Sequence, residues 1–176
     1  MSEQMEKQTS ARLYDASAEA VVAWHSSLYD NKGQRAQLRR ISSPEDVLFT
    51  EGFRVFLGFM PERWKEENFL VPAALVAALL AHVNEHRQGD TFISQVRGDG
   101  ESPKFSELRF QNLIKSQTVD EFYIRCLRAI RIAKGEVNIV SLAGDILQWY
   151  HEFNQTPDRD PTKRLAMRWA KDYYRV

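Results

Sequence analysis

Residues 118–135, TVDEFYIRCLRAIRIAKG, decide the fold class of this 176-residue chain. Their apolar residues recur every three or four positions, which is the spacing of one face of an α-helix. Thr118 followed by Glu121 is a capping-box pattern, and Gly135 is a typical residue after a helix end. The opposite side carries a basic ridge of Arg125, Arg128 and Arg131. The stretch therefore predicts an amphipathic helix with a buried apolar stripe.

Similar periodicity extends in both directions from this helix. Ser43 before Pro44 is an expected helix start, and so is Asp160 before Pro161. The expected helices cover residues 11–30, 34–41, a segment from Pro44 to about residue 57, 68–86, 106–115, 118–134, 138–153 and 161–174. No strand pairs are expected. The pattern predicts an all-α bundle of seven or eight helices, either as one bundle or as two sub-bundles.

The remaining segments complete the expected domain organisation. Residues 1–10 are polar and without periodicity, which predicts a disordered N-terminal tail. Residues 88–104 are rich in Gly, Asp and Ser, and they are expected to form one long loop. Residues 11–176 are expected to form a single helical domain, since their length suits one core.

The composition indicates a cytoplasmic protein. Cys126 is the single cysteine, so no internal disulfide can form, and no signal peptide is recognised at the N-terminus. The longest apolar run, residues 69–83, has 15 residues, whereas a bilayer span needs about 20. We expect this run to be a buried helix and expect no membrane contact.

Charge is unevenly distributed although the net charge is zero. Residues 44–101 carry five basic and ten acidic groups, and residues 104–176 carry thirteen basic and nine acidic groups. Such a chain can bind a polyanion with one face and a protein with another. The uneven distribution favours a binding protein.

Further basic ridges accompany the one on residues 118–134. Arg164, Arg168, Lys171 and Arg175 lie within about 60° of one another on a helix, and Arg109 and Lys115 form a similar ridge on the expected helix over residues 106–115. Lys32, Arg35, Arg39 and Arg40 form a dense patch near the N-terminus. Lys and Arg suit phosphate because they are permanent cationic donors. The alternative is that each ridge is only a solvated helix face.

Three stretches resemble the CasB family, the small subunit of the type I-E CRISPR surveillance complex called Cascade. They are residues 36–46 (AQLRRISSPED), residues 105–127 (FSELRFQNLIKSQTVDEFYIRCL) and residues 161–175 (PTKRLAMRWAKDYYR). The Trp149-Tyr150 pair also fits the family. Residues 45–104 match less well, so contacts that the family makes from that region cannot be placed here.

The resemblance implies an all-helical protein without catalytic activity and without a cofactor. It implies two copies side by side in Cascade, with the backbone subunit, the large subunit and CRISPR RNA as partners. The implied role is to stabilise the hybrid of CRISPR RNA with target DNA, and the displaced strand. By position, the nucleic-acid contacts are Arg40, Arg109, Lys115, Lys163 and Arg164. The helical ridges alone add Arg39, Arg125, Arg128, Arg168 and Lys171.

Two other functions compete with this hypothesis. His82, Glu85 and His86 spell H-x-x-E-H, which on a helix could bind zinc and make a hydrolase. No surrounding sequence supplies a convincing third ligand, so we assign no metal and no catalytic residue. The second alternative is a helical adaptor that binds only proteins, which would agree with the zero net charge.

Overall fold

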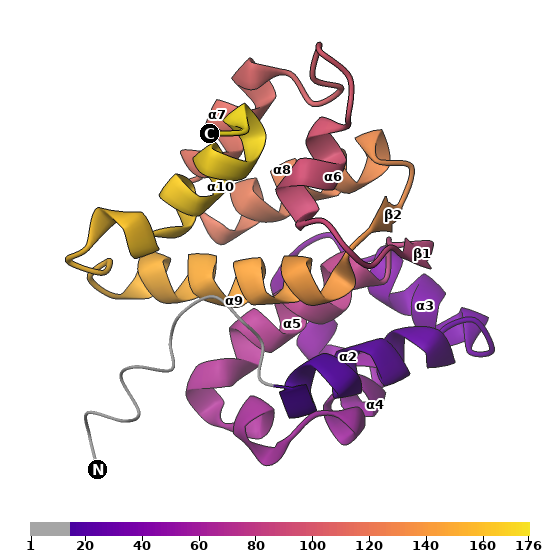
Figure 1. The fold of residues 1–176 in the computed structure, drawn as a ribbon. Helices are drawn as coiled ribbons and strands as arrows, with labels where there is room; N and C mark the ends of the chain where they lie inside the picture. Colours follow the sequence, from indigo (N-terminus) through magenta and orange to yellow (C-terminus); the bar gives the residue numbers. More distant parts are fainter. Residues whose placement is uncertain (1–14) are drawn as a thin grey trace.

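The computed structural model describes residues 15–176, and this part of the chain is all-α, as predicted (Figure 1). Its α-helices are α2 (Asp15–Ser27), α3 (Lys32–Arg39), α4 (Glu51–Phe59), α5 (Leu70–Leu80), α6 (Phe92–Arg97), α7 (Glu107–Ile114), α8 (Val119–Ile132), α9 (Ile139–Asn154) and α10 (Leu165–Tyr174). Short 3-10 helices are η1 (Pro44–Phe49), η2 (Glu62–Lys65), η3 (Glu67–Phe69) and η4 (Pro161–Lys163). The predicted tail, residues 1–10, lies outside the described residues.

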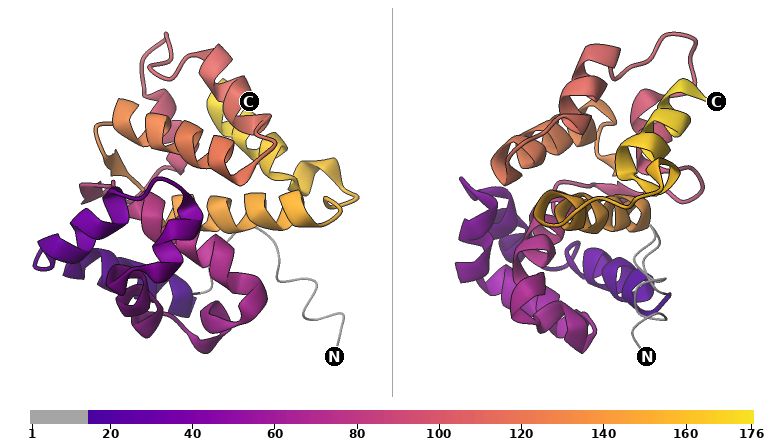
Figure 2. Two further views of the ribbon diagram at one scale, coloured as in Figure 1. Left: turned by 180° about the vertical axis from the view of Figure 1, so that it is seen from behind. Right: turned by 90° about the vertical axis from the view of Figure 1, so that its left-hand side faces the viewer.

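The apolar helix α5 lies at the centre of the molecule. Every residue from Pro72 to Leu80 is buried, because α5 packs against η1 and α9 and also meets α3, α4 and α8. Pro72 stands in the first turn, where its missing N–H costs no hydrogen bond. Helices α2–α4 lie on one side of α5 and α9, and α6–α8 and α10 lie on the other (Figures 1 and 2). No helix in residues 15–176 is long and apolar enough to cross a membrane.

The prediction of one loop over residues 88–104 is wrong, because α6 lies inside it. Thr91 caps this helix, and its side chain accepts a hydrogen bond from Ser94 N. Phe92, Ile93 and Val96 are buried where α6 packs against α8, α9 and α10. The surrounding Gly and Asp residues conceal this single apolar turn in the sequence.

A small parallel pair of strands is a second departure from the prediction. β1 (Glu85–His86) pairs with β2 (Glu136–Val137), and Glu85 lies opposite Glu136. The pair forms directly after α5 and α8, so it fastens the ends of these two helices together. Gly135 precedes β2 with φ of 75°, and a Cβ there would lie 2.5 Å from Asn84 Nδ2. Only glycine fits this crossing without strain.

Helix ends follow the sequence closely in α8 but not at the C-terminus. Thr118 caps α8 and accepts from Glu121 N at 3.1 Å, as the capping box predicts. The expected helix over residues 161–174 is interrupted, because Arg164 has extended backbone between η4 and α10. Arg175 has left-handed backbone after α10. The continuous basic stripe predicted from Arg164 to Arg175 is therefore broken at both ends.

Candidate nucleic-acid interface

The α7–α8 hairpin carries the most open basic residues among the predicted contacts. Ser106 caps α7, and the helix buries Phe110 and Leu113 while it packs on α8. This arrangement turns Arg109 and Lys115 outward, and Arg128 projects from the exposed side of α8. None of these three side chains makes a hydrogen bond or an ion pair within residues 15–176. They are therefore free to receive phosphate oxygens.

Arg125 belongs to the same surface, but its side chain bonds to other residues of the hairpin. Its Nη1 donates to Asn112 O at 2.7 Å and to Ser116 Oγ at 3.2 Å, and it lies 3.4 Å from Glu121 Oε2. These contacts hold the end of α7 on α8. Arg125 therefore orients the segment that presents Lys115 through its Nη1, whereas its Nε and Nη2 have no partner in the described residues.

The arginines of α3 separate into occupied and free members. Arg39 Nε donates to Ala81 O at 2.7 Å, and Arg35 Nη2 donates to Val83 O at 2.9 Å. Both also reach Asn84 Oδ1. Burial, and then the neighbouring Arg35, lower the pKa of Arg39. These two residues cap the end of α5, whereas Arg40 is exposed and has no side-chain partner in the described chain.

His82 lies beside this arginine cluster, and its surroundings contradict the geometry that the zinc hypothesis needs. It follows the end of α5, whereas His86 lies in β1, so the two histidines are not one turn apart on a helix. His82 Nε2 is buried without a partner. Burial, and then Arg39, Arg131 and Arg35, lower the pKa of His82 to about 4. Residues 15–176 contain no cluster of three or more candidate metal ligands.

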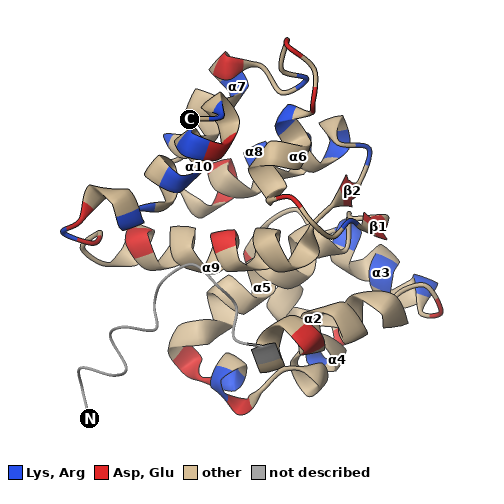
Figure 3. Cartoon of the chain, in the orientation of Figure 1, with Lys and Arg blue, Asp and Glu red and all other residues tan. Residues whose placement is uncertain are grey.

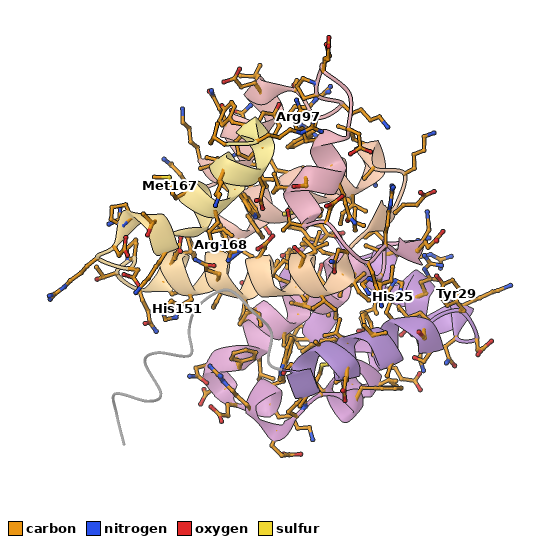
Figure 4. The ribbon with its side chains drawn as sticks, in the orientation of Figure 1. His25, Tyr29, Arg97, His151, Met167 and Arg168 are labelled. Carbon is orange, nitrogen blue, oxygen red and sulfur yellow. The ribbon has the colours of Figure 1, made fainter. Side chains whose placement is uncertain are left out.

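The predicted contacts near the C-terminus also separate into residues that bond within the fold and residues that stay free. Arg168 donates to Asp145 Oδ1 and to Gln148 Oε1, both at 2.7 Å, and it lies between α10 and α9 (Figure 4). Trp169 Nε1 donates to the other Asp145 oxygen at 2.9 Å. Burial raises the pKa of Asp145 to about 6, although both donors oppose the shift. This network docks α10 on α9, so Arg168 serves the fold.

The remaining predicted contacts near α10 differ in exposure. Arg164 is half-buried and donates through Nε to Asp158 O at 2.9 Å. Lys163 and Lys171 are exposed, and their ammonium groups have no partner in the described part of the chain. Figure 3 shows Lys and Arg positions on α3, α8 and α10, whereas the charged positions of α9 are acidic. The basic residues thus form several separate surfaces.

Some residues of these surfaces were not among the predicted contacts. Arg131 is exposed one turn beyond Arg128, and its spacing in the sequence is the signal that could have added it. Arg131 also lies close enough to His82 to lower the pKa of that residue. It therefore connects the α8 ridge with the α3 arginines. No pattern in the sequence indicates this proximity, because it depends on how α5 ends against α8.

The described residues thus define an all-helical protein with exposed basic side chains on several helices. Comparison with known families identifies the family of this chain. The family described as CRISPR-associated protein Cse2 matches residues 34–174, so the chain belongs to it. Cse2 is the CasB small subunit of type I-E Cascade, so the resemblance seen in the sequence is confirmed. No match was found among curated proteins or solved structures. The chain is accordingly a structural Cascade subunit in CRISPR defence.

Proposed function

We propose that this subunit holds nucleic acid in Cascade through its phosphates and has no catalytic role of its own. The ligands are the hybrid of CRISPR RNA with target DNA, and the displaced strand. The observation that carries the proposal is the freedom of Arg109, Lys115 and Arg128 on the α7–α8 hairpin. Exposed cations without acidic partners attract a polyanion and release its counterions on binding.

The other open residues extend this surface. Arg40, Lys163 and Lys171 are exposed and without side-chain partners in residues 15–176, so they join the proposed contacts. Arg39, Arg125, Arg164 and Arg168 support the fold first and are secondary contacts at most. Contacts of this kind read backbone and shape, while base pairing in an RNA-guided complex reads sequence.

The partners follow from the family. We propose that two copies lie side by side in Cascade against its backbone and large subunits. Residues 44–101 carry an excess of carboxylates, which would repel nucleic acid. This excess supports the proposal that one side of the subunit faces other proteins. The basic excess of residues 104–176 would then face the nucleic acid.

The test is charge reversal on the hairpin. Because Arg109 and Lys115 are exposed, R109E/K115E is expected to keep the melting temperature and to weaken oligonucleotide binding about tenfold or more. The slope of log affinity against log salt should fall by about two, one for each lost phosphate contact. Fluorescence anisotropy across a salt series measures both quantities.

The matched control is R54E/R87E, which changes the net charge equally at two exposed arginines outside the proposed surface. Equal weakening by both double variants would mean that only net charge matters, and the proposed surface would be wrong. Wild-type protein that binds no oligonucleotide at low salt, alone or within Cascade, would favour the adaptor hypothesis.

A further inference from the structure

Four aromatic rings form a nearly parallel column from the core to the surface beside the end of α9. Their order is Trp169, Phe122, Trp149 and Phe153. Successive planes are inclined by only 7°, 9° and 11°, and the ring centroids are 6.4, 3.9 and 5.0 Å apart. Trp169 and Phe122 are buried, whereas Phe153 is 43% exposed. The column therefore ends in a ring that is open to solvent.

A small groove lies along this column. It has a volume of about 210 Å³, and Trp149, Phe153 and Trp169 line it together with Ile114, Pro157 and Leu165. Sites for drug-sized ligands have roughly 300–1,000 Å³, so this groove suits a smaller group such as one flat ring. It forms where the end of α9 meets the start of α10 and the residues that follow α7.

Two lysines are close in the sequence to residues that line the groove. Lys115 stands between the lining residues Ile114 and Ser116, and Lys163 lies two residues before Leu165. Lys163 is anchored through its carbonyl, which accepts from Gln148 Nε2 at 2.8 Å, while its ammonium stays exposed. Both lysines are therefore exposed cations close in the chain to residues that line the groove, although neither lines it.

The acidic groups near the groove are engaged within the fold. Glu152 also lines the groove, and its Oε1 accepts from Leu165 N at 2.9 Å and from Gln148 Nε2 at 2.7 Å. Asp160 caps η4 by accepting from Thr162 N. An open aromatic ring flanked by free cations is the arrangement with which proteins hold single-stranded nucleic acid.

We propose that this groove binds one unpaired nucleobase of a single strand, stacked on Phe153, with Lys115 and Lys163 on the neighbouring phosphates. The inference rests on the proposed backbone binding and adds a base contact to it. A paired base is covered by its neighbours in a duplex and cannot enter the groove. The site therefore gives the subunit a preference for single strands that its cationic residues alone would not provide.

The experiment compares two labelled oligomers of equal length, an oligothymidine and an abasic sugar–phosphate chain, by anisotropy with the full chain. Wild type is expected to bind the oligothymidine more tightly. F153A should weaken binding of the oligothymidine roughly fivefold and leave the abasic oligomer unchanged, because one stacking contact is lost. The salt slope should stay the same, since no phosphate contact is removed.

Two further variants separate stacking from folding. F153W keeps an aromatic surface and should retain the preference for bases, even if F153A is less stable. F49A removes a phenylalanine that is 82% exposed in η1, and it should leave both affinities unchanged. Unchanged oligothymidine binding by folded F153A, together with weakening by R109E/K115E, would overturn the base site alone. If wild type binds neither oligomer at low salt, whether alone or within Cascade, the proposed function and the base site are both overturned.

Discussion

The junction between α3 and α5 and the outer side of the α7–α8 hairpin are both rich in basic residues, but they use them differently. At the junction, Arg35 and Arg39 donate to the last carbonyls around α5. On the hairpin, Arg109 and Arg128 have no partner in residues 15–176. The difference teaches that a basic residue serves the fold where an acceptor lies within its reach, and that its side chain stays available to a ligand where no acceptor does. The α9–α10 contact, with Arg168, resembles the junction.

The largest expected effect comes from removing the acid that engages Arg168. D145A leaves the Arg168 guanidinium and the Trp169 N–H without their acceptor, so it should lower stability by about 2–4 kcal/mol. The melting temperature should fall by roughly 5–15 °C, which thermal denaturation measures. D99A, at an exposed aspartate, is the control. Equal melting of the two variants would mean that the α9–α10 network contributes nothing.

The adjacent residues Arg39 and Arg40 give a sharper comparison within one helix end. R39A loses hydrogen bonds to the Ala81 carbonyl and to Asn84, and it should destabilise the fold by about 1–2 kcal/mol. R40A should change stability by less than about 0.5 kcal/mol and should lower the salt slope of oligonucleotide binding by about one. Melting and salt titration measure the two effects. The reverse assignment of effects would contradict the division into occupied and free arginines.

The smallest effect is the pH dependence of the junction. Because the pKa of His82 is lowered to about 4 from 6.5, the folded state binds this proton less readily than the unfolded chain. Above pH 6.5 His82 is neutral in both states and costs the fold nothing. As pH falls toward 4, the unfolded chain takes up this proton more readily, and the free energy of unfolding decreases. The melting temperature of wild type should fall by roughly 2–5 °C more than that of H82L between pH 7 and about 5.5.

Asp145 works in the opposite direction over part of this range. Its pKa is raised to about 6 from 3.8, so its protonation stabilises the fold as pH falls below 6. D145N removes this contribution, so its melting temperature should fall further than that of wild type as pH falls below 6.

The outcome that would contradict the His82 prediction is a pH profile of H82L that matches wild type. It would mean that His82 does not titrate as the structure indicates.

The sequence predicted the helices with long periodic patterns well. The stripe of α8 and the caps at Thr118 and Asp160 are local features, so local spacing was sufficient. Helix α6 was missed because one apolar turn among glycines carries too little periodicity, and its burial depends on three distant helices. The parallel strands were missed for a similar reason, since two residues on each side leave no alternating pattern.

The sequence placed the basic residues on the correct helices, but it did not indicate which of their side chains are free of partners within the fold. Helical spacing placed Arg125 and Arg168 on ridges, and both lie on the helices where they were expected. Spacing within one helix cannot indicate an acceptor on another, such as Asn112 O for Arg125 or Asp145 for Arg168. Whether an arginine is free is a property of the tertiary structure. The family match independently supports the functional class but leaves each individual contact as a prediction.

The way α5 ends has a consequence for the electric field of the protein. The peptide dipoles of a helix add up to roughly half a negative charge at its C-terminus. In α5 this partial charge lies directly beside the guanidinium groups of Arg35 and Arg39. A polyanion approaching α3 therefore meets a weaker positive potential than the number of arginines suggests. The end of α7 has the same effect on a smaller scale beside Lys115, which is its C-cap residue. Formal charge alone therefore overstates how strongly the arginines of α3 attract an anion.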